Sequence, residues 1–195
     1  MALETDLDEI DWVVVDVETT GLHPDSGDRI CEIGAVKYDN MRIKEIGQFQ
    51  SLINPDRAMP TVATQINGIH DDMLRTAPTA GGILSDFCAF AGDSVLAAYN
   101  ARFDLSFIQM ELNRARLPLL ALPVVDVLWM ARRLLPGLRR YKLAYVAHEI
   151  GVKDHNAHRA MGDVLATGHL LKNFLPKLKA QGINTVGELM RRQGQ

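Results

Sequence analysis

The chain has 195 residues, of which 47% are hydrophobic and 23% are charged, and its formal net charge at pH 7 is −3. This length and composition are typical of one globular α/β domain with a sizeable core. The small negative charge excludes a polycation that would coat long duplex DNA by charge alone.

The sequence predicts a protein of a reducing compartment, and we expect it in the cytoplasm. Its two cysteines, Cys31 and Cys88, lie far apart and form neither a zinc pattern nor a disulfide framework. The stretch 1–11 is expected to be a short acidic leader, and it does not resemble a signal peptide because it lacks an apolar centre. No apolar run approaches the ~20 residues that a membrane helix needs, so no membrane association is expected.

The first part of the chain predicts three strands joined by tight turns. The segment 12–18 is an apolar run that predicts a strand buried on both faces. It leads through a polar turn into a second strand over 29–38, rich in β-branched residues. A turn at 39–40 and alternation over 41–53 predict a third strand. Strands joined by tight turns pair antiparallel, so these three are expected to be antiparallel neighbours.

Helices then alternate with two further strands. In chain order, the periodicity predicts a helix over 60–68, a helix over 80–91, a strand over 94–99, a helix over 102–114, a strand over 123–126, and helices over 127–135, 139–150, 160–178 and 184–192. Crossover connections place the last two strands parallel to the first. We expect an α/β fold whose mixed five-stranded sheet is flanked by helices. The domain is expected to span 12–180, with 181–195 as its C-terminal helix and tail.

Two acids end the first strand, where Asp16 and Glu18 are followed by the turn 19–22. Side chains two residues apart on a strand point to the same side. Two neighbouring buried carboxylates repel each other unless a cation neutralises them, and Mg²⁺ prefers such oxygen ligands. The alternative is a strand whose end has reached solvent.

A second group of polar residues, Asn100 to Asp104, follows the fourth strand, at the edge where sites form in open α/β sheets. Asp104 could instead be an ordinary acid in the first turn of a helix. A third group contains His158 and Asp163. Five residues along a helix put two side chains ~140° apart, so His158 is expected in the loop and Asp163 in the first turns of the next helix.

His158 could also be a structural or surface histidine. A zinc site formed by His148, His155 and His158 is a further alternative, although its spacing matches no known ligand pattern. Asp126 ends the fifth strand and is expected to cap the next helix, not to bind metal.

Several residues could contact a nucleic acid. The backbone amides of Thr19, Thr20 and Gly21 could meet a ribose or phosphate oxygen, and Leu22 could press on a base, unless this is an ordinary turn. Phe103 could stack on a base, whereas Phe107 fits the core better. Two basic groups could track a phosphate backbone or be solvated helix ends: Arg132, Arg133, Arg139, Arg140 and Lys142, and then Arg191 and Arg192.

The segments 16–21, 100–104 and 158–163 together resemble, in order, the three motifs of the DEDDh group of DnaQ-like 3′–5′ exonucleases. This family includes the epsilon proofreading subunit of bacterial DNA polymerase III. The segment 28–36 also resembles the family's second strand. The resemblance covers about 12–175 and implies a ribonuclease H-like fold. A histidine at 158, where another subgroup has tyrosine, indicates the His subgroup.

The resemblance implies cleavage with two Mg²⁺ or Mn²⁺ ions. Asp16 would bridge both ions, Glu18 and Asp163 would hold the ion that carries the attacking water, and Asp104 would support the other. His158 would be the general base, and Asn100 would belong to the substrate-binding set with Phe103 and the turn 19–22. The chain departs from the family at Tyr99, where many relatives have histidine, and at Val164, where alanine is common.

Three functions follow as hypotheses. The first is a 3′–5′ exonuclease that releases nucleoside monophosphates from single-stranded or frayed DNA, in proofreading or repair, with a DNA polymerase subunit as a candidate partner. The second is a 3′–5′ exoribonuclease similar to RNase T or oligoribonuclease. The third is a non-catalytic module that binds nucleic acid beside a polymerase, although all five catalytic positions are intact. The sequence leaves the oligomeric state open.

Overall fold

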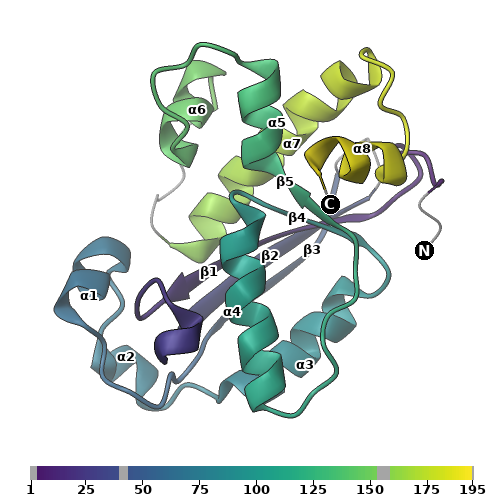
Figure 1. The fold of residues 1–195 in the computed structure, drawn as a ribbon. Helices are drawn as coiled ribbons and strands as arrows, with labels where there is room; N and C mark the ends of the chain where they lie inside the picture. Colours follow the sequence, from purple (N-terminus) through teal and green to yellow (C-terminus); the bar gives the residue numbers. More distant parts are fainter. Residues whose placement is uncertain (1–3, 40–43, 153–158, 195) are drawn as a thin grey trace.

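The fold is built on one five-stranded sheet with the strand order β3-β2-β1-β4-β5 (Figure 1). The structure is a computed structural model that describes residues 4–39, 44–152 and 159–194. The strands are β1 (Trp12–Thr19), β2 (Ile30–Asp39), β3 (Lys44–Leu52), β4 (Val95–Ala98) and β5 (Val124–Asp126). Pairs β1·β2 and β2·β3 are antiparallel, whereas β1·β4 and β4·β5 are parallel, which confirms the predicted mixed sheet.

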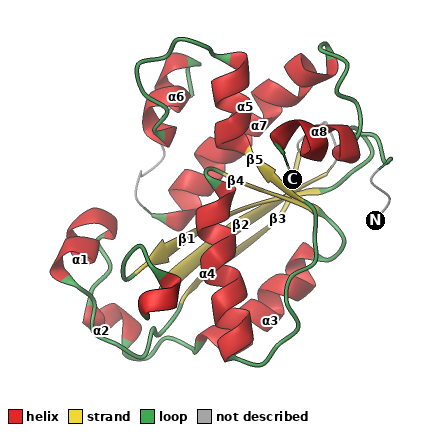
Figure 2. Cartoon of the chain, viewed as in Figure 1, coloured by secondary structure: helices red, strands yellow, loops and turns green. Residues whose placement is uncertain are grey.

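Helices cover both faces of the sheet (Figure 2). They are α1 (Thr61–Asn67), α2 (Asp71–Leu74), α3 (Ala80–Ala91), α4 (Ala101–Arg114), α5 (Val127–Leu134), α6 (Leu143–Glu149), α7 (Ala160–Lys179) and α8 (Val186–Gln193). A short 3-10 helix, η1 (Pro24–Ser26), lies between β1 and β2. No helix in these described stretches is long and apolar enough to cross a bilayer.

Alternation along β1 divides the core into two halves. Trp12 and Val14 pack with residues of α5, α6, α7 and α8, whereas Val13, Val15 and Val17 pack with residues of α3 and α4. Because side chains alternate across a strand, Asp16 and Glu18 continue the row of Trp12 and Val14. Their carboxylates therefore belong to the face that α7 covers.

Helix α7 lies very close to the sheet at its start. A Cβ on Gly34 of β2 would come within 3.0 Å of the backbone of Ala160 and Met161. Glycine at this position therefore permits the first turn of α7 to approach β1 and β2.

The structure differs from the predicted elements at several points. Helix α6 begins at Leu143 and not at Arg139, because Tyr141 is held in a non-helical segment. Its hydroxyl donates to the Leu135 carbonyl at 2.8 Å, and its own carbonyl accepts from the Tyr99 hydroxyl at 2.6 Å. Helices α2 and η1 were not predicted, since four- and three-residue helices leave no periodic pattern. Leu7, before β1, is fully buried in the core half that α7 lines.

Candidate active site

Three carboxylates converge where β1 passes the start of α7. Asp16 and Glu18 come from β1, and Asp163 lies in the first turn of α7, as its spacing from the preceding loop predicted. One ligand oxygen of each lies within 4.8 Å of the other two. A strand and a helix far apart in sequence thus bring together three potential oxygen ligands.

The carboxylates strongly disfavour carrying their negative charges together. Burial is the main cause that raises the pKa of Asp16 well above its usual range, and the charges of Asp104, Asp163 and Glu18 add to it. Burial and the charge of Asp163 raise the pKa of Glu18 to about 7, although Asn67 and Arg159 partly oppose this. A bound cation would remove this repulsion, and the all-oxygen donor set fits a hard divalent ion.

Asp104 lies beside this group but outside the set of three converging oxygens. It is on α4, is only 2% exposed, and accepts a hydrogen bond from the Val17 N–H at 3.1 Å. Burial raises its pKa to about 8, although the Val17 hydrogen bond opposes this. Its carboxylate therefore ties α4 to the strand segment between Asp16 and Glu18, which an ordinary first-turn acid would not do.

Glu32 is a buried acid of the site that the sequence analysis gave no role. It faces Glu18 across the β1·β2 pair and is 1% exposed. Arg159 binds it in a bidentate ion pair at 2.7 and 3.0 Å, and Gln50 and the Ala160 N–H also donate to it. Burial alone would raise the pKa of Glu32, but these hydrogen bonds outweigh it and hold the pKa below its usual range.

The pair Glu32–Arg159 fixes the residue just before α7 to the sheet. Its signal in the sequence was a single acid inside the apolar second strand, facing the motif acid Glu18. Asn67, at the end of α1, is a second residue that the sequence analysis missed; it is buried and interacts with Glu18.

Of the three histidines proposed above as catalytic or zinc-binding residues, the structure describes only His148. His155 and His158 lie outside the described residues, so the general base and the zinc alternative stay predictions. His148 lies on α6 with 85% of its side chain exposed, 3.8 Å from the Glu149 carboxylate.

Comparison with known proteins identifies the family. The family model RNase_T, described as Exonuclease, matches residues 13–171. The chain belongs to this exonuclease family. It is 43% identical over 158 residues to the DNA polymerase III subunit epsilon of Treponema pallidum, which covers 80% of this chain and 72% of that protein. It is 36% identical over 192 residues to a DNA polymerase III subunit epsilon-like protein of Rhodobacter capsulatus, which covers 96% of this chain.

The chain spans only 27% of the length of the R. capsulatus protein. Its fold is similar to that of Escherichia coli exonuclease I solved with a dT13 oligonucleotide, with a TM-score of 0.76 and 22% identity over 88% of this chain and 43% of that one. This likeness confirms the predicted α/β fold.

The turn after the acids is held mostly by its own hydrogen bonds. The Thr19 hydroxyl donates to the Gly21 carbonyl at 2.6 Å, and the Thr20 N–H donates to the Arg29 carbonyl at 2.9 Å. The Thr20 amide is therefore engaged within the protein, and contact of this turn with a ligand stays a prediction. Leu22 is 70% exposed, which leaves it accessible to a base.

The remaining residues of the predicted substrate set lie at the start of α4. Asn100 is exposed in the left-handed region at φ 67°, and its N–H donates to the Asp126 carboxylate at 3.1 Å. Asp126 also caps α5 through the Leu128 N–H, as predicted. Phe103 is half-buried with its ring centroid 5.0 Å from that of Phe107, which lies in the core as expected.

Neither departure from the family motifs adds a side chain to the acidic cluster. Tyr99 bonds to the Tyr141 carbonyl, and Val164 is buried in the core. Among the basic residues, Arg133 lies over the Trp129 ring at 5.6 Å and donates to Gln181. The other members of both basic groups are exposed, so a role in contacting phosphates stays a prediction.

Proposed function

We propose that the chain is a metal-dependent 3′–5′ exonuclease that releases nucleoside monophosphates from single-stranded or frayed DNA ends. The observation that carries this proposal is the convergence of Asp16, Glu18 and Asp163 within 4.8 Å, with raised pKa values for Asp16 and Glu18. Bound cations would stabilise the charged form of these carboxylates at neutral pH, because they offset the burial and the repulsion that raise the pKa values. Membership in the exonuclease family supports a phosphodiester as the bond that is cleaved.

Two Mg²⁺ or Mn²⁺ ions are the proposed cofactors, with Asp16, Glu18, Asp163 and Asp104 as the residues that would hold them. When bound, such ions stabilise the attacking and leaving oxygens of an in-line displacement. His158 would accept the proton of the attacking water, since an ordinary histidine pKa of ~6.5 suits a base near neutral pH. Leu22 and Phe103 would contact the terminal bases.

DNA is the proposed substrate, because the relatives above are named for a DNA polymerase subunit. The same names support a polymerase partner and a role in proofreading. Cys31 and Cys88 are both free thiols, which agrees with the reducing cytoplasm where replication takes place in bacteria.

The test is nucleotide release from 5′-labelled DNA and RNA oligonucleotides of one sequence, with Mn²⁺ or with EDTA. We expect a metal-dependent ladder that shortens from the 3′ end of DNA and is lost in Asp16→Asn. Asp86→Asn is the matched control, because it removes one charge from an exposed position on α3. A ladder on RNA alone would contradict the DNA assignment, and full activity of Asp16→Asn would contradict the site.

A further inference from the structure

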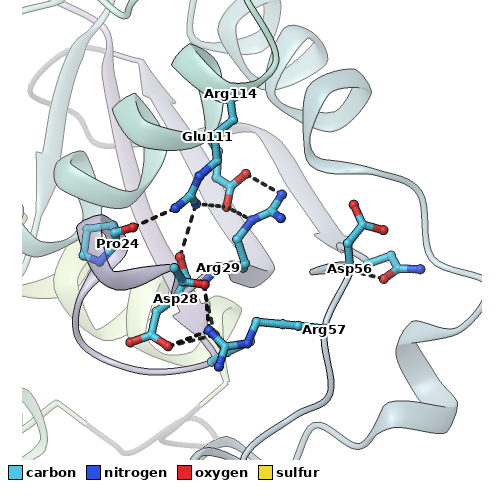
Figure 3. Close-up of polar contacts among 10 residues, drawn as sticks. Pro24, Asp28, Arg29, Asp56, Arg57, Glu111 and Arg114 are labelled. Carbon is cyan, nitrogen blue, oxygen red and sulfur yellow. Dashed lines mark hydrogen bonds and ion pairs between the residues drawn. The ribbon is translucent and has the colours of Figure 1, made fainter.

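A network of charged residues joins α4 to the loop 21–28, which follows the acids of β1 (Figure 3). None of the proposed catalytic steps uses it. Its centre is Glu111 on α4, which is 1% exposed. Arg29 binds both of its carboxylate oxygens, at 2.6 and 2.9 Å, and Arg114 binds one of them at 3.0 Å. Two arginines thus share one buried carboxylate.

Arg114 connects this centre to the loop 21–28, which follows the acids of β1. One of its terminal nitrogens donates to the Pro24 carbonyl at 2.7 Å, and the other donates to the Asp28 carbonyl at 3.2 Å. Figure 3 shows this arginine reaching from α4 toward η1. The loop is therefore fixed to α4 by its backbone at two points.

Asp28 fixes the same loop from the inside. Its carboxylate accepts from the His23 N–H at 3.0 Å, from the Thr20 hydroxyl at 3.4 Å and from Arg57 at 3.0 Å. A Cβ on Gly21 would come within 2.3 Å of this carboxylate, so a larger residue there would displace Asp28 from these hydrogen bonds. The single large apolar side chain between these anchors is Leu22, which points its exposed surface to solvent.

This arrangement is costly for a loop on the surface. Taking Glu111 and its arginines out of water consumes most of what their ion pairs gain, so the network adds little net stability. It does select one conformation, because a bidentate arginine accepts few geometries. The residues of a binding site that contact the ligand need supporting residues of this kind to hold them in place.

We propose that Glu111, together with Arg29 and Arg114, is a positioning residue that holds Leu22 against the terminal base of the substrate. This inference rests on the proposed exonuclease function. The hydrogen bonds of the Glu111 carboxylate go to Arg29 and Arg114, which hold the loop 21–28, so its effect is on the loop. Disturbing it reduces the fraction of molecules whose loop is ready to bind, and KM rises in proportion.

The test is a double-mutant cycle of Glu111→Gln and Leu22→Ala, read as KM and kcat on a 5′-labelled DNA oligonucleotide. We expect each variant to raise KM about tenfold, as when one molecule in ten keeps the binding conformation, with kcat within about twofold. The double variant should be no worse than the stronger single variant, because both changes remove one interaction. The rise in Tm on adding Mn²⁺ should equal that of the wild type.

Two further variants keep the test decisive. Arg114→Met removes the loop contacts but leaves the Arg29–Glu111 pair, and should raise KM in the same way even if Glu111→Gln does not fold. Lys179→Gln breaks an ion pair with Asp6 and Asp8 at the end of α7 and should leave KM unchanged.

Three outcomes would overturn the inference. The first is an unchanged KM in the folded variants, and the second is an additive effect of Glu111→Gln and Leu22→Ala on KM. The third is a fall in kcat together with loss of the rise in Tm on adding Mn²⁺. These outcomes require an active wild type. A wild type that releases no nucleotide from DNA or RNA would overturn the proposed function as well.

Discussion

Replacing Asp104 by asparagine should stabilise the metal-free protein while removing its activity. Asparagine has nearly the same shape, keeps an oxygen that can accept from the Val17 N–H, and carries no charge. Burial raises the pKa of Asp104 to about 8, so the folded state holds a proton that the unfolded state releases near pH 4. The folded wild type therefore loses stability as the pH rises from about 4 to about 8.

The size of the effect follows from that shift. About four pKa units at ~1.4 kcal/mol each give an upper bound of about 5–6 kcal/mol at pH 8. Asp16 and Glu18 compete for the same protons, so we expect about half of this, ~3 kcal/mol. For a chain of this length such a gain raises Tm by about 6–12 °C. At pH 4.5 the difference should be below about 1 kcal/mol, because Asp104 is then mostly protonated in the folded protein.

Urea unfolding of the wild type and Asp104→Asn, in EDTA at pH 4.5 and pH 8, measures both values. Asp86→Asn, which removes an exposed charge, should show no such gain. A difference between wild type and Asp104→Asn that does not grow with pH would refute the reasoning that buried, mutually repelling carboxylates destabilise the metal-free site.

Three further predictions concern the metal site and the core. The rise in Tm caused by Mn²⁺ should be larger at pH 8 than at pH 5.5, because below the Glu18 pKa of about 7 protons compete with the ion; an equal rise at both pH values would contradict this. Glu32→Gln should lower the free energy of unfolding in urea by about 1.5–3 kcal/mol, because Arg159 no longer fixes the start of α7. For the same reason it should weaken Mn²⁺ binding measured by calorimetry, and an unchanged Mn²⁺ affinity would argue against this role. Phe107→Ala should lower the free energy of unfolding by about 3–5 kcal/mol, and Phe103→Ala should lower it clearly less because Phe103 is half-buried. Equal losses in urea unfolding would show that both are core residues.

Local patterns predicted the frame of the site. The apolar run before Asp16 identified β1, and the period of two placed Asp16 and Glu18 on one face. Asp163 was placed in the first turn of a helix because a position deeper in that helix would turn it away from His158. The start of α6 was missed because the hydrogen bond from the Tyr99 hydroxyl holds the Tyr141 carbonyl, and these two residues are 42 positions apart. No local pattern reports such a contact.

The acids that support the site were also beyond the reach of local patterns. Glu32 and Glu111 occur singly within a strand and a helix, where a lone acid usually indicates a solvent-facing position. Both are 1% exposed; Arg159 lies 127 residues from Glu32 in the chain, and Arg29 lies 82 residues from Glu111. Their roles became visible only when the strand register and the packing of α4 and α7 were known.

The contrast between Glu18 and Glu32 shows how the fold separates a proposed metal ligand from a supporting residue. The two residues are of one type, face each other across β1 and β2, and are both largely removed from water. Burial raises the pKa of Glu18 to about 7, whereas Arg159, Gln50 and the Ala160 N–H hold that of Glu32 below its usual range. Glu32 therefore keeps its charge and has its oxygens engaged by protein donors, while Glu18 still gains from an external cation. The position of Arg159 therefore distinguishes the two acids, because its hydrogen bonds engage the oxygens of Glu32 and leave the Glu18 carboxylate to the proposed cation.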